Sequence, residues 1–194
     1  PSLMGVAQTG DCAYARQAGR IVGGEMRALG FNMNFAPVAE VVTDSQKDML
    51  GARSAGQDPA MAADMAASFF EGLKDANILS IAKHFPGHGN ATVNPHFYLP
   101  VTNYPVPSIE RDMAPFIALH KKRIDGFMTA HVCFAKLPPV GPDRPLSIDA
   151  NRLPALVKKH GLGDVLWVTD ELFHMKAVLK SMGHSSTPAP SSAY

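Results

Sequence analysis

The amino-acid sequence predicts an α/β fold built on a parallel sheet. Four short, continuously apolar segments are each preceded by a segment in which apolar residues recur at helical spacing. Continuous apolar strands are typical of parallel sheets that are buried on both faces. Polar residues follow each apolar segment, at the strand end where parallel α/β folds place their active sites. These observations fit either a (β/α)8 barrel or an open doubly wound sheet.

The elements follow one another as alternating helices and strands. The first helix is predicted over Tyr14–Leu29 and ends at a glycine, before an apolar strand over Met33–Val38. Asp58 and Pro59 then supply an N-cap and a proline at the first position of the second helix. The third helix, over Ser108–Lys121, is expected to be interrupted or offset at Pro115. The remaining elements are a strand over Ile78–Ala82, a helix over Ser108–Lys121, a strand over Ile124–Ala130, a helix over Asp149–His160 and a strand over Val165–Thr169.

Composition and charge exclude several classes of partner. The 194 residues include 18 Lys and Arg against 17 Asp and Glu, mixed along the chain, so we expect no nucleic-acid or anionic membrane partner. No apolar run approaches the roughly 20 residues that a membrane-spanning helix needs. The two isolated cysteines lack the spacing of a disulfide framework or zinc cluster. Because the chain begins with Pro1 and not Met, its location is open, with a cytoplasmic one favoured.

The most specific segment is the loop after the second strand, Lys83–Gly89, which reads Lys-His-Phe-Pro-Gly-His-Gly. Two glycines and a proline after a strand make a rigid, irregular loop, which can bring Lys83, His84 and the downstream His96 to one pocket. Lys83 and His84 can donate hydrogen bonds to substrate hydroxyls. A purely structural, solvent-exposed loop fits the same residues.

This loop is similar to the signature loop of bacterial β-N-acetylglucosaminidases of glycoside hydrolase family 3. Four further segments agree with that family in order and approximate spacing over residues 1 to about 180. They are Asn34–Val38, which resembles its third barrel strand, Gly51–Gly56, which resembles its Arg-Ser-Phe-Gly loop, Met128–His131 at the next strand end, and Val168–Leu172 around the nucleophile. The resemblance implies an incomplete (β/α)8 TIM-type barrel over residues 1–180, with about four of the eight units, followed by a disordered tail over 181–194.

The resemblance also implies a reaction, a retaining hydrolysis of β-N-acetylglucosaminides with Asp170 as the nucleophile. Taken alone, an aspartate at a strand end is often only a helix N-cap. In the family an aspartate–histidine pair acts as acid/base, and His96 matches the histidine while Asn94 precedes it. The residues that match the sugar-binding positions are Arg53, Lys83, His84 and His131. His131 either lines the pocket floor or packs as a hydrogen-bonded core histidine. A small carbohydrate is the implied partner, with no metal and no cofactor.

Several features depart from the family pattern. Asn94 and Asn90 stand where the family has aspartates, and an amide stabilises an imidazolium less than a carboxylate does and can favour the wrong tautomer. Pro95 stiffens a loop that is expected to be mobile in members of the family. Phe173–Met175 holds one residue more than the family usually has between the leucine after the nucleophile and the next methionine. Because (β/α)8 barrels typically need ~250 residues, a partner chain or further segments are expected to complete the barrel.

Three other functions remain open at this point. The chain can be a catalytically inactive or sugar-binding remnant, or a family 3 phosphorylase in which phosphate replaces water as the acceptor. It can also be a metal-dependent barrel hydrolase. The candidate ligands for a metal are His84, His88, His96, His131 and Asp170. Pro86 and Gly87 lie between the first two histidines and exclude the helical spacing that zinc sites exploit.

Overall fold

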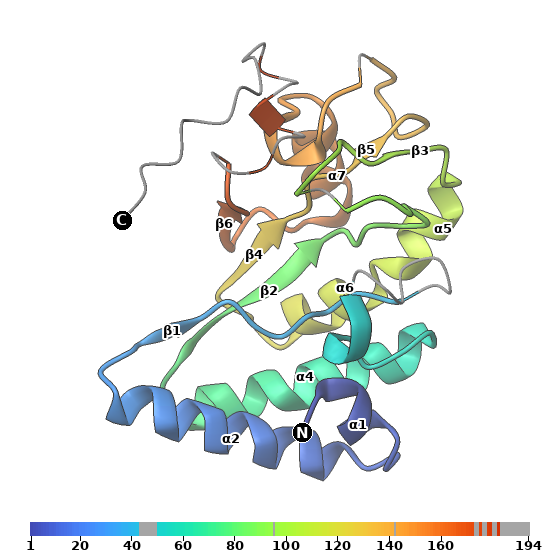
Figure 1. Ribbon diagram of the computed structural model, residues 1–194. Coiled ribbons are helices and arrows are strands. Elements are labelled where there is room, and N and C mark those ends of the chain that lie inside the picture. The colour runs from blue at the N-terminus through green and yellow to red at the C-terminus, as the bar shows by residue number, and fades with distance from the viewer. Residues whose placement is uncertain are drawn as a thin grey trace, which may run out of the picture.

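A parallel sheet forms the centre of the molecule. The computed structural model describes residues 1–42, 50–94, 96–141 and 143–172, together with Met175, Val178, Leu179 and Met182. In this part of the chain the sheet has the strand order β1-β2-β4-β6, and every neighbouring pair is parallel (Figure 1). The strands are β1 (Met33–Asn34), β2 (Leu79–Phe85), β4 (Gly126–Thr129) and β6 (Leu166–Thr169). The alternation of helices and strands that the sequence predicted is therefore present.

Helices precede each strand of this sheet and pack beside it (Figure 1). They are α1 (Leu3–Ala7), α2 (Cys12–Ala28), α4 (Pro59–Asp75), α5 (Val106–Asp112), α6 (Ala114–Lys121) and α7 (Arg152–His160), with single 3-10 turns at η2 (Gly51–Arg53) and η3 (Leu146–Ile148). A second, two-stranded parallel sheet joins β3 (Val101–Thr102) to β5 (Cys133–Phe134). The sequence did not predict α1 or this small sheet. Within the described ranges, no helix has the length and apolarity needed to cross a bilayer.

Two helix boundaries have the causes that the sequence indicated. The Asp58 side chain accepts hydrogen bonds from the backbone N–H groups of Ala60 and Met61, which caps α4 at Pro59. Pro115 lies in the first turn of α6, where its missing N–H costs least. The predicted single helix over Ser108–Lys121 is therefore divided into α5 and α6.

The first strand is shorter than the predicted Met33–Val38. It ends at Asn34, because Pro37 has no N–H to continue the hydrogen-bond ladder with β2. Contact with β2 resumes around Pro37, whose carbonyl accepts the Lys83 N–H at 3.0 Å, and Ala39 N–H donates to the Lys83 carbonyl at 2.7 Å. These bonds bring the segment after β1 alongside the end of β2.

An aromatic cluster fills the core beneath the carboxyl ends of the strands. The Phe85 ring lies 4.9 Å from that of Trp167 and 5.3 Å from that of Phe116, both edge to face. Phe127 stacks on Phe85 at 5.8 Å between ring centroids. Because these rings come from β2, β4, β6 and α6, their packing fixes the strand ends relative to one another.

Helices α2 and α4 cross closely because glycines lie at their contact. A Cβ on Gly19 would lie 2.2 Å from the Phe69 carbonyl oxygen, and a Cβ on Gly72 would lie 2.1 Å from the Arg16 carbonyl oxygen. These are backbone atoms, so a larger side chain forces the helices apart.

We therefore expect Gly19→Ala to lower the free energy of unfolding by ~1 to 3 kcal/mol, the usual cost of overpacking. Gly24→Ala is the matched control, since it lies in the same helix with nothing within 4 Å of its Cβ position. It should raise the free energy by roughly 0.5 to 1 kcal/mol through backbone entropy. Urea unfolding of both variants measures the difference, and equal stabilisation by both would contradict the close crossing.

Candidate active site

A pocket of about 230 Å³ opens at the carboxyl ends of the strands. Its described lining residues are Leu50, Arg53, Lys83, His84, His88, Asn94, His96, Asp170 and Met175. The structure thus brings together six of the seven residues that the sequence proposed for the site; the exception is His131. Asp170 is the one carboxylate among these lining residues, and it faces several basic side chains.

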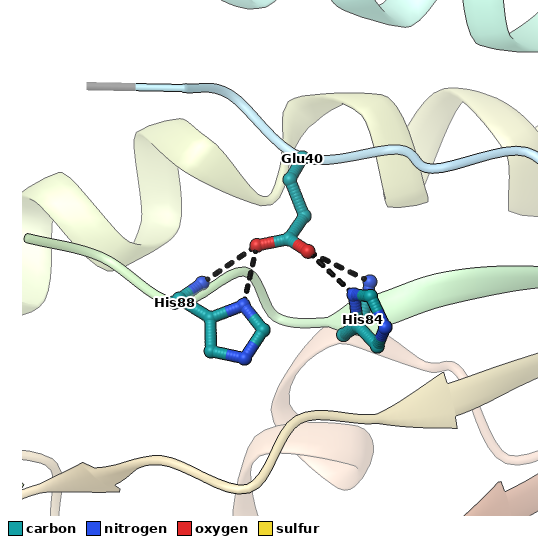
Figure 2. Close-up of side chains that lie close together, drawn as sticks. All are labelled: Glu40, His84 and His88. Atoms are coloured by element: carbon teal, nitrogen blue, oxygen red, sulfur yellow. Dashed lines mark hydrogen bonds and ion pairs between the residues drawn. The ribbon is translucent and has the colours of Figure 1, made fainter. Parts of the chain in front are cut away.

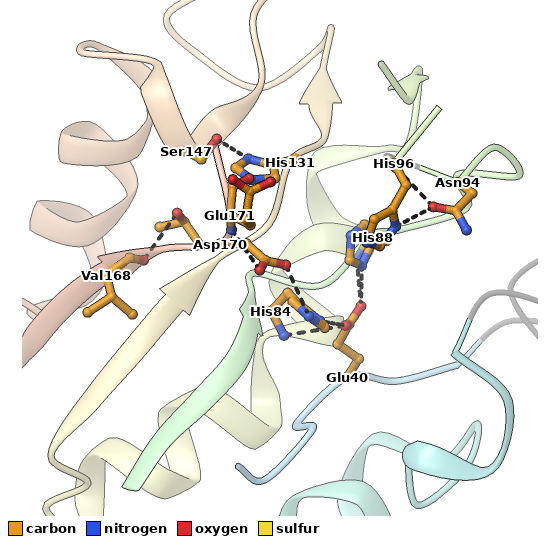
Figure 3. A network of polar contacts seen from close by, with 11 residues as sticks. Glu40, His84, His88, Asn94, His96, His131, Ser147, Val168, Asp170 and Glu171 are labelled. Carbon is orange, nitrogen blue, oxygen red and sulfur yellow. Dashed lines mark hydrogen bonds and ion pairs between the residues drawn. The ribbon is translucent and has the colours of Figure 1, made fainter. Parts of the chain in front are cut away.

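Asp170 directly follows β6, where the end of the strand presents its carboxylate to the pocket (Figure 3). Its Oδ1 accepts the Glu171 N–H at 2.8 Å, and its Oδ2 lies 3.6 Å from His84 Nε2. The Lys83 ammonium is half-buried, and burial lowers its pKa while the negative charge of Asp170 opposes that shift. Asp170 is therefore an accessible carboxylate, held by a backbone N–H and placed beside cationic groups.

The buried carboxylate of Glu40 holds two histidines of the signature loop (Figure 2). Its Oε1 accepts from His84 Nδ1 at 2.6 Å and from the His84 N–H at 3.3 Å. Its Oε2 accepts from His88 Nδ1 at 2.8 Å and from the His88 N–H at 3.0 Å. Burial alone would raise the pKa of Glu40, but electrostatic attraction to His88 and the hydrogen bonds from both histidines outweigh it and hold the pKa well below its usual range.

The distances in this cluster suit hydrogen bonds and not metal ligation. Glu40, His84 and His88 form a group whose ligand-type atoms lie within 4.8 Å of one another. Ligands at ~2.0 to 2.1 Å around a tetrahedral zinc are separated by about 3.3 Å. The Oε to Nδ1 separations of 2.6 and 2.8 Å are shorter than that. A metal here would have to displace the two Nδ1 protons and open the cluster.

His96 and Asn94 form a side-chain pair on the exposed loop after Gly89. Asn94 Oδ1 accepts both the His96 N–H at 2.9 Å and His96 Nδ1 at 2.7 Å. Because a backbone N–H can only donate, the accepting atom is the amide oxygen, and Nδ1 therefore carries the ring proton. The amide thus selects the same tautomer that a carboxylate would, contrary to the expectation that it favours the wrong one. It supplies no negative charge. The other replaced aspartate, Asn90, accepts a hydrogen bond from the Thr102 hydroxyl.

His131 lies beside Glu171 and Ser147 and is not among the residues that line the pocket (Figure 3). Its Nε2 lies 2.8 Å from the Glu171 carbonyl, which can only accept, so Nε2 carries the proton. Its Nδ1 then accepts from the Ser147 hydroxyl at 2.6 Å. Burial lowers the pKa of His131, which favours the neutral ring that this arrangement needs. Both ring nitrogens are occupied, which fits the alternative of a hydrogen-bonded core histidine; its contact with substrate stays a prediction.

Comparison with known proteins decides the family. The chain matches the model of the glycosyl hydrolase family 3 N terminal domain over residues 1–191. The chain belongs to glycosyl hydrolase family 3. A beta-hexosaminidase of Idiomarina loihiensis is 35% identical over 126 residues, 64% of this chain and 37% of the relative. Beta-hexosaminidase LpqI of Mycobacterium tuberculosis is 32% identical over 190 residues, 95% of this chain and 48% of the relative.

Solved structures show the same fold. A family 3 beta-N-acetylglucosaminidase from Paenibacillus sp. str. FPU-7 superposes with a TM-score of 0.83 at 34% identity, over 92% of this chain and 33% of that chain. The family and the barrel-type α/β fold predicted from the sequence are therefore confirmed. The chain spans between about a third and a half of the length of these relatives.

Sequence reasoning gave Glu40 and Ser147 no role in the site, and it considered His88 only as a candidate metal ligand. The available signal for Glu40 was its position after β1, which corresponds to the position of Lys83 and His84 near the end of β2. Nothing in the local sequence indicated that Ser147 pairs with His131. Two expectations, the stiffening by Pro95 and the extra residue within Phe173–Met175, fall wholly or mainly outside the described residues, as does most of the tail over 181–194.

Proposed function

We propose that this chain carries the catalytic site of a retaining β-N-acetylglucosaminidase that acts on amino-sugar β-glycosides of the kind that occur in cell walls. The observation that carries the proposal is that a strand-end carboxylate, Asp170, shares one pocket with Lys83, His84, Arg53 and a tautomerically fixed His96. The names of the relatives support the substrate class.

In the first step, an Asp170 oxygen attacks the anomeric carbon while protonated His96 gives its Nε2 proton to the departing glycosidic oxygen. The bond to the leaving group breaks as a glycosyl ester to Asp170 forms. In the second step, neutral His96 takes a proton from water, whose oxygen attacks the same carbon and releases Asp170. Lys83, His84 and Arg53 bind the sugar hydroxyls and hold the anomeric carbon near the nucleophile. Each of the two steps inverts the configuration of the anomeric carbon, so the product has the same β configuration as the substrate.

The pocket also favours one alternative acceptor, inorganic phosphate. Asn94 leaves His96 without a neighbouring carboxylate, so Asp170 is the one described anionic group lining a pocket that contains Arg53 and Lys83. Incubation of an aryl β-N-acetylglucosaminide with and without phosphate separates the two reactions. Hydrolysis gives free N-acetylglucosamine in both, whereas phosphorolysis gives its 1-phosphate only when phosphate is present. If neither N-acetylglucosamine nor its 1-phosphate forms, the inactive, sugar-binding alternative remains.

Asn94→Asp is expected to raise turnover by about tenfold on substrates with poor leaving groups, where protonation limits the rate. The amide already fixes the His96 tautomer, so the added carboxylate contributes its charge, which stabilises the imidazolium. Activated aryl glycosides should gain less, since their leaving groups depart with little protonation. Paired kinetics on both substrate types check this, and an equal gain on both would assign the effect to something other than proton donation.

A further inference from the structure

Glu40 is a buried carboxylate that takes no direct part in the proposed reaction. Its exposed fraction is 0%, and a buried carboxylate is costly unless hydrogen bonds surround it. An ionised carboxylate has about four lone-pair positions. His84 and His88 fill all four, each with its Nδ1 and its backbone N–H. The carboxylate is thus fully used in holding these two residues.

We propose that Glu40 is a positioning residue of the sugar site, which fixes His84 and His88 with the proton on Nδ1 and turns the Nε2 of each ring into the pocket as a hydrogen-bond acceptor. This inference rests on the proposed function for the identity of the ligand. The orientation of the rings is independent of it.

The tautomers follow from the chemistry of the acceptor. An ionised carboxylate can only accept, so Nδ1 of both rings must be protonated, and in the neutral form of each ring the lone pair lies on Nε2. His84 Nε2 is 3.6 Å from Asp170 Oδ2, too far for a hydrogen bond. Since both rings line the pocket, their Nε2 atoms are placed to accept from a ligand hydroxyl. His84 therefore accepts from the sugar, whereas the sequence alone suggested that it donates.

Glu40 also fixes the loop that carries the two rings. Its bonds to the backbone N–H groups of His84 and His88 span Phe85–Gly87, and Gly87 there has a φ of 100°, which favours glycine. The ring centroids of the two histidines lie 5.3 Å apart. One carboxylate thereby sets the spacing as well as the orientation of two imidazoles.

The first test is nitrogen-15 NMR of the imidazole rings of this chain, assigned with His84→Ala and His88→Ala. We expect both rings to carry the proton on Nδ1 and to leave Nε2 unprotonated near neutral pH. A ring with a proton on Nε2, whether or not Nδ1 is also protonated, would overturn the proposal. So would stoichiometric zinc that shifts both rings together, because it would make the cluster a metal site.

The second test replaces Glu40 by glutamine, whose amide offers one acceptor and one donor group. At least one ring then loses its acceptor, so we expect it to change to the Nε2–H tautomer and the dissociation constant for N-acetylglucosamine to rise by ~10 to 100-fold. Glu25→Gln, on the exposed face of α2, should change neither. Glu40→Asp should retain both Nδ1 protons.

Three outcomes separate the possibilities. Unchanged tautomers and sugar affinity in folded Glu40→Gln would contradict the positioning role. If this variant fails to fold, the positioning role is tested by the tautomers of His84 and His88 in the wild-type chain. Failure of the wild-type chain to bind N-acetylglucosamine, with the expected tautomers present, would contradict the proposed function and leave the positioning of the rings intact.

Discussion

Asp170→Ala is expected to lower kcat/KM for an aryl β-N-acetylglucosaminide by at least ~10⁴-fold, the order of loss when an enzyme loses its nucleophile. No other described carboxylate lines the pocket, and the one buried beside it, Glu40, is saturated by four N–H donors and cannot replace Asp170. Steady-state kinetics measure the loss, in this chain and in a hybrid in which LpqI supplies the segments outside the matched region.

Asp164→Asn provides the matched control for that loss. Asp164 lies just before β6, at the opposite end of the strand from Asp170, and its carboxylate is exposed and bonded to His120. The control should retain the parental rate. Comparable losses in both variants would indicate damage to β6, and a loss below tenfold in Asp170→Ala would reject Asp170 as the nucleophile.

His96→Ala is expected to lower kcat by ~10² to 10⁴-fold on substrates with poor leaving groups, the usual contribution of general acid catalysis. On activated aryl glycosides, the first step should lose much less, because their leaving groups depart without a proton. His120→Ala is the control, since this histidine lies on α6 and pairs with Asp164 outside the pocket. An equal loss on both substrate types would mean that His96 supports binding or structure and is not the proton donor.

The sequence predicted the parts of the fold that depend on local chemistry. The Asp58 cap and the break at Pro115 can each be inferred from neighbouring residues. The two-residue strands β3 and β5 could not be found in this way, because a period cannot be detected over two positions. The early end of β1 depended on a missing donor at Pro37, and the apolar run around that residue concealed it.

The site was predictable where the family motif names the residue, and it was not where partners are distant in sequence. Asp170, Lys83 and His96 meet in one pocket as their motifs implied. The role of Glu40 depends on two histidines 44 and 48 residues away. The position of His131 depends on Ser147, 16 residues along the chain. Such pairings arise from the tertiary fold, so periodicity and local propensity do not reveal them.

Covalent trapping tests the central claim most directly. A 5-fluoro derivative of N-acetylglucosaminyl fluoride has a good leaving group, while its ring fluorine withdraws electrons and slows hydrolysis of the glycosyl-enzyme. Mass spectrometry of the digested protein should then locate one sugar on Asp170, and proton NMR of the normal reaction should show a β product first. A label on Glu40 or Glu171, or turnover that gives an α product first, would contradict a retaining mechanism with Asp170 as the nucleophile.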